Sequence, residues 1–132
     1  MVLRERAGSR FTVDDQVSIH LGYEQNVPMR PDIIVSEGGK LGLVADCKYK
    51  RLEPGEFKNY DVYQMLAYCT ALGVQRGLLI YPVHTAEMQD VVAIRNTDVM
   101  IQQATIDLGK EEIEELNQEC ETFAQSVLSC IL

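Results

Sequence analysis

The stretch MRPDIIVSEGGKLGLVADCKYK, residues 29–50, constrains the fold of this 132-residue chain more than any other segment. Its two apolar runs, PDIIVS and LGLVADCKY, are rich in the residues that favour extended backbone. They are joined by EGGK, and a glycine pair of this kind is typical of a β-hairpin turn. The stretch therefore predicts two antiparallel strands that bring two aspartates and a lysine to the open end of the hairpin.

The rest of the sequence adds strands and two helices around this hairpin. We expect strands at residues 16–21, 76–82, 90–96 and 99–108. Apolar residues recur at steps of three and four over residues 56–72, which predicts a helix that Gly73 ends. Because this helix lies between the hairpin and a continuously apolar strand, it predicts a mixed sheet with a right-handed α crossover. The expected fold class is α/β, bordering on α+β.

The length predicts one domain over residues 1–132. We divide it into a core at residues 16–82, additional strands at residues 83–108, and an amphipathic acidic C-terminal helix at residues 110–132. The four cysteines have no metal-binding spacing, and no apolar run approaches the ~20 residues that cross a bilayer. The N-terminus has no hydrophobic signal core. These features predict a reduced, cytoplasmic protein with no membrane partner.

The net charge of −8 lies almost wholly in the second half of the chain. Residues 1–60 hold nine Lys/Arg and nine Asp/Glu, whereas residues 61–132 hold three and eleven. The half that contains the hairpin is therefore neutral and has most of the cations. An acidic total normally disfavours nucleic acid as a partner. This distribution of charge does not exclude DNA as a partner.

The end of the second hairpin strand reads Asp46-Cys47-Lys48. Residues two apart in a strand share a face, so Asp46 and Lys48 project together while Cys47 points to the opposite, buried side. Such tripeptides are common by chance, and Asp–Lys pairs at strand ends are usually solvated. The tripeptide alone does not decide between a surface pair and a catalytic one.

The hairpin register decides whether Asp32 joins this face. A two-residue loop at residues 38–39 sets Asp32 opposite Ala45, whereas a three-residue loop at residues 38–40 sets it opposite Asp46. Opposed residues have Cβ atoms ~5 Å apart, and two carboxylates that close require a cation. A catalytic interpretation therefore predicts a three-residue or bulged turn at residues 38–40.

A hard divalent ion suits such a site. Mg²⁺ takes oxygen ligands, which Asp32, Asp46 and the backbone carbonyl of Cys47 could supply. Lys48 would stand beside the metal, where it could polarise a water or stabilise the charge of a phosphate in the transition state. Two carboxylates, a lysine and a metal suffice for a phosphodiesterase.

The full string MRPDIIV, LVADCKYK, NYDVYQMLAYCTALG and GLLIYP resembles the PD-(D/E)xK nuclease superfamily, and most specifically the nuclease domain of McrC. McrC is the cleavage subunit of 5-methylcytosine-specific restriction systems, and the resemblance covers residues 16–82. It implies an αβββαβ restriction-endonuclease-like core, here apparently without its first helix, and Mg²⁺- or Mn²⁺-dependent endonuclease cleavage of DNA. By position, Asp32 and Asp46 would be catalytic metal ligands, and Lys48 would activate or orient the attacking water.

The resemblance also implies supporting residues. Gln64 and Tyr68 lie four apart on one helix face, and nuclease relatives with this Q-x-x-x-Y spacing use it beside the active site. For Tyr68 a core position is an equal alternative. Glu24 could supply the acidic residue that the first helix of related nucleases provides.

Three further expectations concern partners. Phosphate contacts could come from Lys50, Arg51 and Lys58. The resemblance implies a McrB-like, GTP-driven AAA+ partner, and self-association stays open.

Two alternatives remain beside the endonuclease. One is a non-catalytic or truncated nuclease-fold module that docks to the AAA+ partner, and the other is a PD-(D/E)xK nuclease of DNA repair or recombination.

Overall fold

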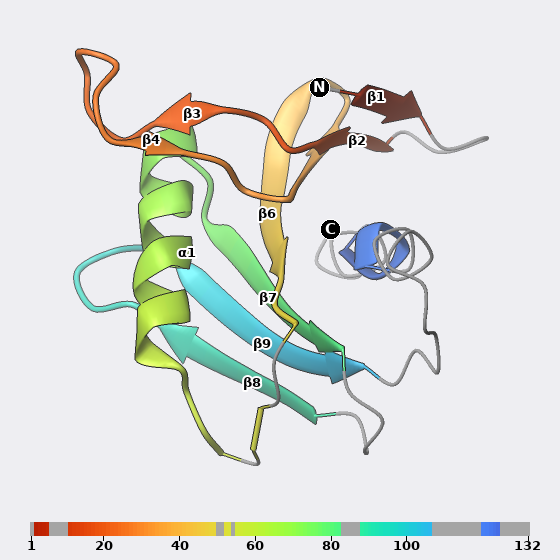
Figure 1. The fold of residues 1–132 in the computed structure, drawn as a ribbon, viewed down its shortest axis with the longest axis vertical. Helices are drawn as coiled ribbons and strands as arrows, with labels where there is room; N and C mark the ends of the chain where they lie inside the picture. Colours follow the sequence, from red (N-terminus) through yellow and green to blue (C-terminus); the bar gives the residue numbers. More distant parts are fainter. Residues whose placement is uncertain are drawn as a thin grey trace.

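A computed structural model describes residues 2–5, 11–49, 52–53, 55–82, 88–106 and 120–124. Within these residues a seven-stranded sheet has the order β1-β2-β5-β6-β7-β9-β8, and a separate two-stranded ribbon pairs β3 with β4 (Figure 1). The strands are β1 Val2–Glu5, β2 Phe11–Asp15, β3 Ile19–His20, β4 Pro28–Met29, β5 Ile33–Glu37, β6 Lys40–Cys47, β7 Arg76–Pro82, β8 Met88–Ala93 and β9 Met100–Ile106. The helix α1 spans Asn59–Leu72.

The hairpin of β5 and β6 forms as expected, but its turn differs from the prediction. Glu37 pairs with Lys40, so the turn has two residues, Gly38 and Gly39. Both have positive φ, 57° and 82°, which is the backbone of a tight hairpin turn and favours glycine. The predicted three-residue or bulged turn at residues 38–40 is therefore wrong.

An irregularity further along the hairpin changes the register instead. Ser36 pairs with Leu41, whereas the next residue back, Val35, pairs with Leu43. Gly42 is thus an extra residue in β6, which is the count of a β-bulge. Beyond the bulge Ile33 pairs with Ala45. This is the same register that the predicted three-residue turn at residues 38–40 would have produced.

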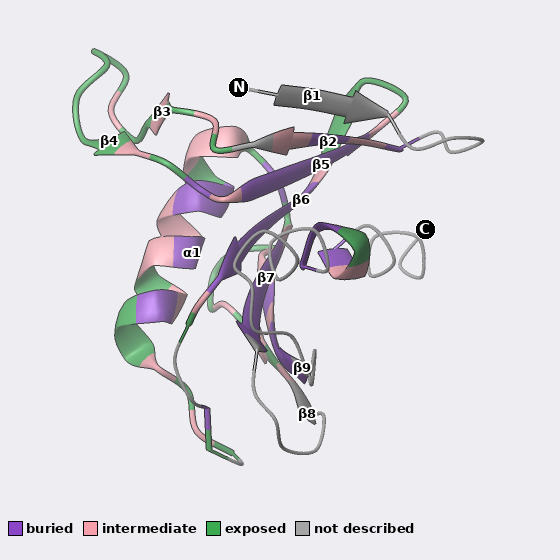
Figure 2. Cartoon of the chain, turned by 45° about the vertical axis from the view of Figure 1, so that its right-hand side comes forward, coloured by how far each residue is buried: buried purple, intermediate pink, exposed green. Residues whose placement is uncertain are grey.

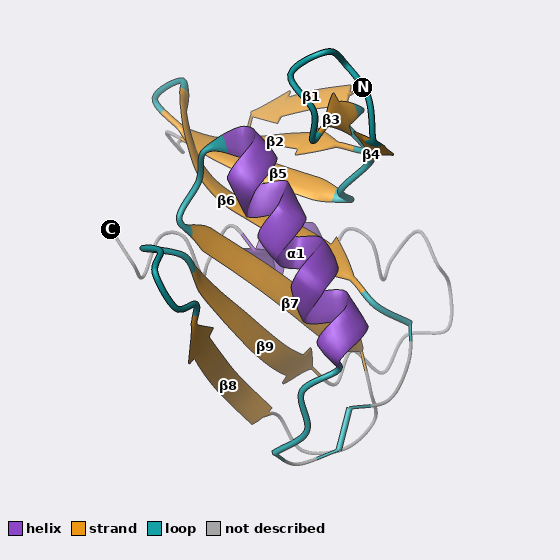
Figure 3. Cartoon of the chain, turned by 90° about the vertical axis from the view of Figure 1, so that its left-hand side faces the viewer, coloured by secondary structure: helices purple, strands orange, loops and turns teal. Residues whose placement is uncertain are grey.

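The predicted mixed sheet and α crossover are confirmed. β6 pairs antiparallel with β5 but parallel with β7, and α1 connects these two parallel strands. β9 runs parallel to β7, and β8 closes the edge in the antiparallel direction. The helix lies across one face of the sheet (Figure 3).

Close packing of α1 on β7 depends on a glycine. A Cβ atom at Gly77 would lie 2.6 Å from Cγ of Met65 and 3.0 Å from Sγ of Cys69. Since neither distance is a normal contact, only glycine allows this approach of helix and strand. The helix ends where the sequence predicted, at Gly73, whose φ of 68° is left-handed and whose following N–H, from Val74, reaches the carbonyl of Cys69.

The core consists of two clusters, one on each face of the sheet. On the face that α1 covers, Met65, Tyr68 and Cys69 pack with Leu79 and other strand residues. On the opposite face the cluster includes Cys47, Leu78, Cys120 and Ala124, the last two from residues 120–124, which are helical. Figure 2 shows burial concentrated on the central strands and on the inner side of α1.

Several element boundaries differ from the sequence prediction, and the strand predicted at residues 90–96 is β8, Met88–Ala93. The strand that pairs with β5 is β2, Phe11–Asp15, and not residues 16–21, of which only Ile19 and His20 form a short strand in the separate ribbon. The helix begins at Asn59, three residues later than predicted, because Lys58 still has extended backbone.

The ends of the chain are only partly described. The described residues before Asp32 form the strands β1 to β4 and include no helix. Of the expected C-terminal helix at residues 110–132, residues 120–124 are described and are helical, and the remainder lies outside the described residues. Among described helices none has the length and apolar composition that crossing a membrane requires.

Candidate active site

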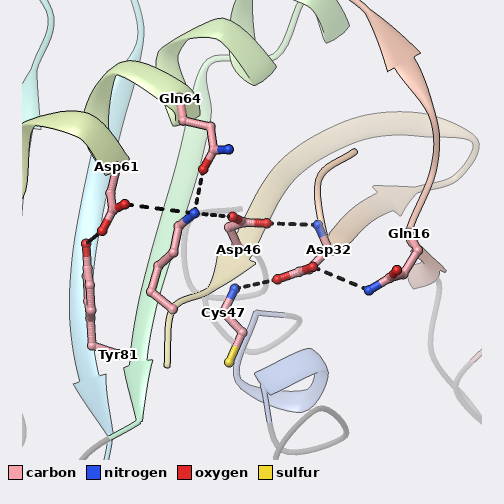
Figure 4. Close-up of polar contacts among 8 residues, drawn as sticks. Gln16, Asp32, Asp46, Cys47, Asp61, Gln64 and Tyr81 are labelled. Atoms are coloured by element: carbon pink, nitrogen blue, oxygen red, sulfur yellow. Dashed lines mark hydrogen bonds and ion pairs between the residues drawn. The ribbon is translucent and has the colours of Figure 1, made fainter. Parts of the chain in front are cut away.

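The hairpin register brings Asp32 and Asp46 together at the end of the sheet. The backbone N–H of Asp32 donates to Oδ1 of Asp46 at 2.9 Å, and the N–H of Cys47 donates to Oδ2 of Asp32 at 3.0 Å (Figure 4). Each carboxylate thus accepts a hydrogen bond from the strand that bears the other. One oxygen of each side chain is therefore held by a backbone donor.

Crowding of the two carboxylates affects protonation of Asp32. Its pKa is raised to about 6, first because burial disfavours the charged form and next because of the negative charge of Asp46. The N–H of Cys47 and the charge of Lys48 act in the opposite direction. An additional cation beside the two carboxylates would favour the ionised form of Asp32.

Lys48 connects the aspartates to helix α1. Its backbone N–H donates to the carbonyl of Ile80 at 2.7 Å, which extends the pairing of β6 with β7 past Cys47. Its ammonium lies 2.7 Å from Oδ2 of Asp46 and donates to Oε1 of Gln64. A longer ion pair joins it to Oδ1 of Asp61 at 3.9 Å. The lysine head is therefore held between a strand carboxylate and two helical side chains.

Gln64 and Tyr68 both lie on the side of α1 that faces the aspartates. Gln64 contacts Lys48 directly. Tyr68 is 4% exposed and belongs to the core cluster on the α1 face. Its pKa is raised, first by burial and then by the charges of Asp46 and Asp32, so the phenol is also within electrostatic reach of the site. Both interpretations of Tyr68, core residue and neighbour of the site, describe part of its environment.

Two polar residues beside the site were missed in the sequence analysis. Gln16 follows β2, and its side-chain amide donates to Oδ1 of Asp32 at 3.4 Å. Asp61 is 1% exposed on α1, and its Oδ2 accepts a hydrogen bond from the hydroxyl of Tyr81 at 2.9 Å. The sequence did contain a signal for Asp61, because Asp61, Gln64 and Tyr68 have the i, i+3, i+7 spacing of one helix face. No local signal identifies Gln16, whose contact depends on the pairing of β2 with β5.

The donor set at this site fits a hard divalent cation. The described residues contain no group of three or more His, Cys, Asp or Glu side chains arranged to hold a metal. The two carboxylates of Asp32 and Asp46 are nevertheless adjacent oxygen donors, and burial together with the charge of Asp46 raises the pKa of Asp32. Mg²⁺ is typically bound by one or two protein carboxylates and completes its shell with water and substrate oxygens.

The remaining candidates lie further from this cluster or are not described. Glu24 is exposed in the loop between β3 and β4 and forms no three-ligand group with Asp32 and Asp46. Lys58 lies directly before α1, and its ammonium is 3.3 Å from both carboxylate oxygens of Glu56. Lys50 and Arg51 lie outside the described residues.

Comparison with known proteins gives a consistent family assignment. The family model described as McrBC 5-methylcytosine restriction system component matches residues 1–82, which is more than half of the chain. No curated protein matches the chain.

A solved structure shares the fold. This is the refined half-complex from the tetradecameric assembly of Thermococcus gammatolerans McrB AAA+ hexamers with bound McrC, in which a chain matches with a TM-score of 0.58 and 16% identity. The match covers 93% of this chain and 29% of that one, so the present chain spans less than a third of its length. The likeness supports the α/β, restriction-endonuclease-like sheet that the sequence predicted.

Proposed function

Because this chain belongs to the McrBC 5-methylcytosine restriction system component family, we propose that it is the metal-dependent DNA endonuclease domain of a McrC-type restriction subunit. One observation carries the proposal. The carboxylates of Asp32 and Asp46 are held side by side by hydrogen bonds from the backbone N–H groups of Cys47 and Asp32, and the ammonium of Lys48 is 2.7 Å from Oδ2 of Asp46. This set of groups is suited to hydrolysis of phosphodiester bonds.

Asp32 and Asp46 would hold Mg²⁺ or Mn²⁺, with the backbone carbonyl of Cys47 as a further ligand. The ion would supply Lewis acidity at a phosphate oxygen and lower the pKa of a bound water. The backbone N–H groups of Asp32 and Cys47 orient the carboxylates before any ion arrives. The strands therefore provide a site that needs little rearrangement, which is the condition for effective electrostatic catalysis.

Lys48 is the proposed partner of the attacking water or of the scissile phosphate. Its side chain is 15% exposed, and the contacts of its ammonium to Asp46 and Gln64 fix its direction. A positioned cation at this place would stabilise negative charge that develops on the phosphate. Gln64 orients the lysine, and the charges of both aspartates act on Tyr68.

DNA binding would require cations around this site. Lys58 is the described candidate, and its pairing with Glu56 would have to be exchanged for a phosphate contact. Lys50 and Arg51 follow Lys48 by two and three residues and remain candidates on that ground alone. The acidic second half of the chain is unsuited to phosphate contact, so the contacts with DNA phosphates would come from residues 1–60.

We also propose a McrB-like AAA+ protein as the partner. The support is the family assignment together with the fold shared with a chain of an assembly in which McrC is bound to McrB AAA+ hexamers. Recognition of the DNA site and the energy for movement along DNA would then come from the partner, and cleavage from this domain.

Nicking of supercoiled plasmid tests the function directly. The protein is incubated with Mg²⁺, with and without its AAA+ partner, and Asp46→Asn is the matched inactive variant. Metal-dependent nicking by the wild-type protein and not by Asp46→Asn would support the endonuclease. Binding to the AAA+ partner without any nicking would support the alternative, a non-catalytic docking module.

A further inference from the structure

Asp61 is a buried carboxylate that the proposed chemistry does not yet use. It lies in the first turn of α1 and is 1% exposed, which is unusual for an ionisable side chain. Charged groups in such positions are normally paired or hydrogen-bonded, because an uncompensated buried charge is costly. Here Oδ2 accepts a hydrogen bond from the hydroxyl of Tyr81 at 2.9 Å, and Oδ1 lies 3.9 Å from the ammonium of Lys48 (Figure 4).

Tyr81 fixes the direction of this carboxylate. It is fully buried in β7, the strand parallel to β6, so its ring cannot turn away from α1. Its hydroxyl occupies one oxygen of Asp61 and leaves the other directed at Lys48. Three elements, α1, β6 and β7, therefore meet at a single charged contact.

Lys48 has two classes of partner with different relations to the proposed metal. Its contact with Asp46 is to a carboxylate that would also bind the cation. Its contacts with Asp61 and Gln64 are to helical side chains that the cation would not occupy. A divalent ion on Asp46 would neutralise that carboxylate and repel the ammonium, since both are positively charged. The only negatively charged group described on the helix side of Lys48 is then Asp61.

We propose that Asp61, oriented by Tyr81, is the positioning residue that keeps the ammonium of Lys48 at the active site when the metal occupies Asp32 and Asp46. The inference rests on the proposed nuclease function and assigns Asp61 no contact with DNA or metal. Gln64 contributes a neutral hydrogen bond to the ammonium of Lys48. Asp61 contributes a negative charge in place of that of Asp46, which the metal would neutralise.

Kinetics of Asp61→Asn are the first test. Asparagine keeps the shape of the side chain and can still accept from Tyr81, but it lacks the charge that holds Lys48. We expect kcat for plasmid cleavage in the presence of the AAA+ partner to fall by about 10- to 100-fold, the scale of a misplaced catalytic group, with KM for DNA unchanged. Asp98→Asn, which removes a charge from an exposed position in the turn between β8 and β9, is the control and should cut like the wild type. A wild-type kcat in Asp61→Asn would overturn the proposal.

A double-mutant cycle separates positioning from a structural role. If Asp61 acts only through Lys48, the variant Asp61→Asn/Lys48→Ala should cleave at the rate of Lys48→Ala alone. Losses that multiply would show that Asp61 acts by another route, and would overturn the proposal. Tyr81→Phe leaves the carboxylate charged but free to rotate, so we expect a smaller loss, about 3- to 10-fold in kcat.

The state of Lys48 can be followed without measuring cleavage. In protein labelled with ¹³C-lysine, the two Hε protons of Lys48, identified by their absence in Lys48→Ala, should have distinct shifts when the side chain is ordered. We expect them to stay distinct in the wild type at saturating Mg²⁺, and to merge toward the signal of exposed lysines in Asp61→Asn at saturating Mg²⁺. Distinct Lys48 signals in Mg²⁺-bound Asp61→Asn would overturn the positioning role.

These measurements distinguish the inference from the proposed function. A wild-type protein that binds Mg²⁺ but never nicks DNA would refute the nuclease and leave the order of Lys48 to decide the role of Asp61. Failure of the wild type to bind Mg²⁺ would overturn both.

Discussion

The two faces of strand β6 near its end differ sharply in chemistry. Asp46 and Lys48 project to the face that α1 covers, where their contacts are charged and polar. Cys47, between them in sequence, projects to the other face, where its sulfur lies 2.6 Å from that of Cys120 within an apolar cluster. Strand alternation thus assigns three consecutive residues to two tasks, with chemistry on one face and stability on the other. If this division holds, substitutions on the first face should change activity and those on the second should change the free energy of unfolding.

The largest effect is expected from Asp46→Asn, on the polar face. Loss of this carboxylate should abolish Mg²⁺ binding and DNA cleavage, because one of only two described carboxylate ligands is removed. The fold should remain intact, since neutralising Asp46 also removes its repulsion of Asp32. Calorimetric Mg²⁺ titration, plasmid nicking and thermal unfolding together test this. Normal cutting, or an unfolded variant, would make Asp46 a structural residue.

Lys48→Ala should have the next largest effect on activity. Cleavage should fall by roughly 10²-fold, as is usual when one positioned transition-state group is lost. Mg²⁺ affinity should stay the same or increase slightly, because a neighbouring positive charge only weakens a cation site. Lys48→Arg should not restore the rate, since a planar guanidinium does not replace a compact ammonium. A Lys48→Ala variant that nicks plasmid at the wild-type rate would show that Lys48 has no catalytic role.

On the apolar face, Cys120→Ala should change stability and leave chemistry alone. The residue is fully buried against the cluster that contains Cys47. Removing its sulfur should lower the free energy of unfolding by about 1 kcal/mol, the cost of a small cavity. The rate of cleavage per folded molecule should not change. Chemical denaturation measures the first quantity and plasmid nicking the second, and a large loss of nicking with normal stability would break the division between the faces.

Asp32→Asn should have an effect as small as that of Cys120→Ala, on the stability of the metal-free protein. The pKa of Asp32 is raised from 3.8 to about 6, so its contribution to stability is fully present below pH 3.8 and is lost as pH rises through about 6. The wild type should therefore lose stability between about pH 4 and pH 7, and Asp32→Asn should lack this loss. Because Asp32 is only half-buried, solvent screening reduces the expected gain of the variant at pH 8 to about 1 kcal/mol. Urea unfolding in chelator at a series of pH values measures it, and a variant less stable than the wild type at pH 8 would contradict the repulsion.

The candidate site was predictable in part. The two-residue spacing of Asp46 and Lys48 placed them on one face of an apolar strand, and the family resemblance gave them and Gln64 a place at the site. The proximity of Asp32 to Asp46 was inferred from a bulged turn, yet the extra residue is Gly42 within β6. A bulge can occupy several positions in a hairpin with the same effect on register beyond it, so its place could not be read from the glycine pair alone.

Sequence by itself determined the local elements of this protein. The apolar runs specified β5, β6 and β7, and Gly73 specified the end of α1, because strand alternation, helical period and left-handed backbone are properties of neighbouring residues. Tertiary structure decided which of these residues meet. Asp61 faces Lys48 only because α1 crosses from β6 to β7, and Gln16 reaches Asp32 only because β2 pairs with β5. Such contacts join residues 13 and 16 apart in the chain, and they depend on packing and register, which no local pattern encodes.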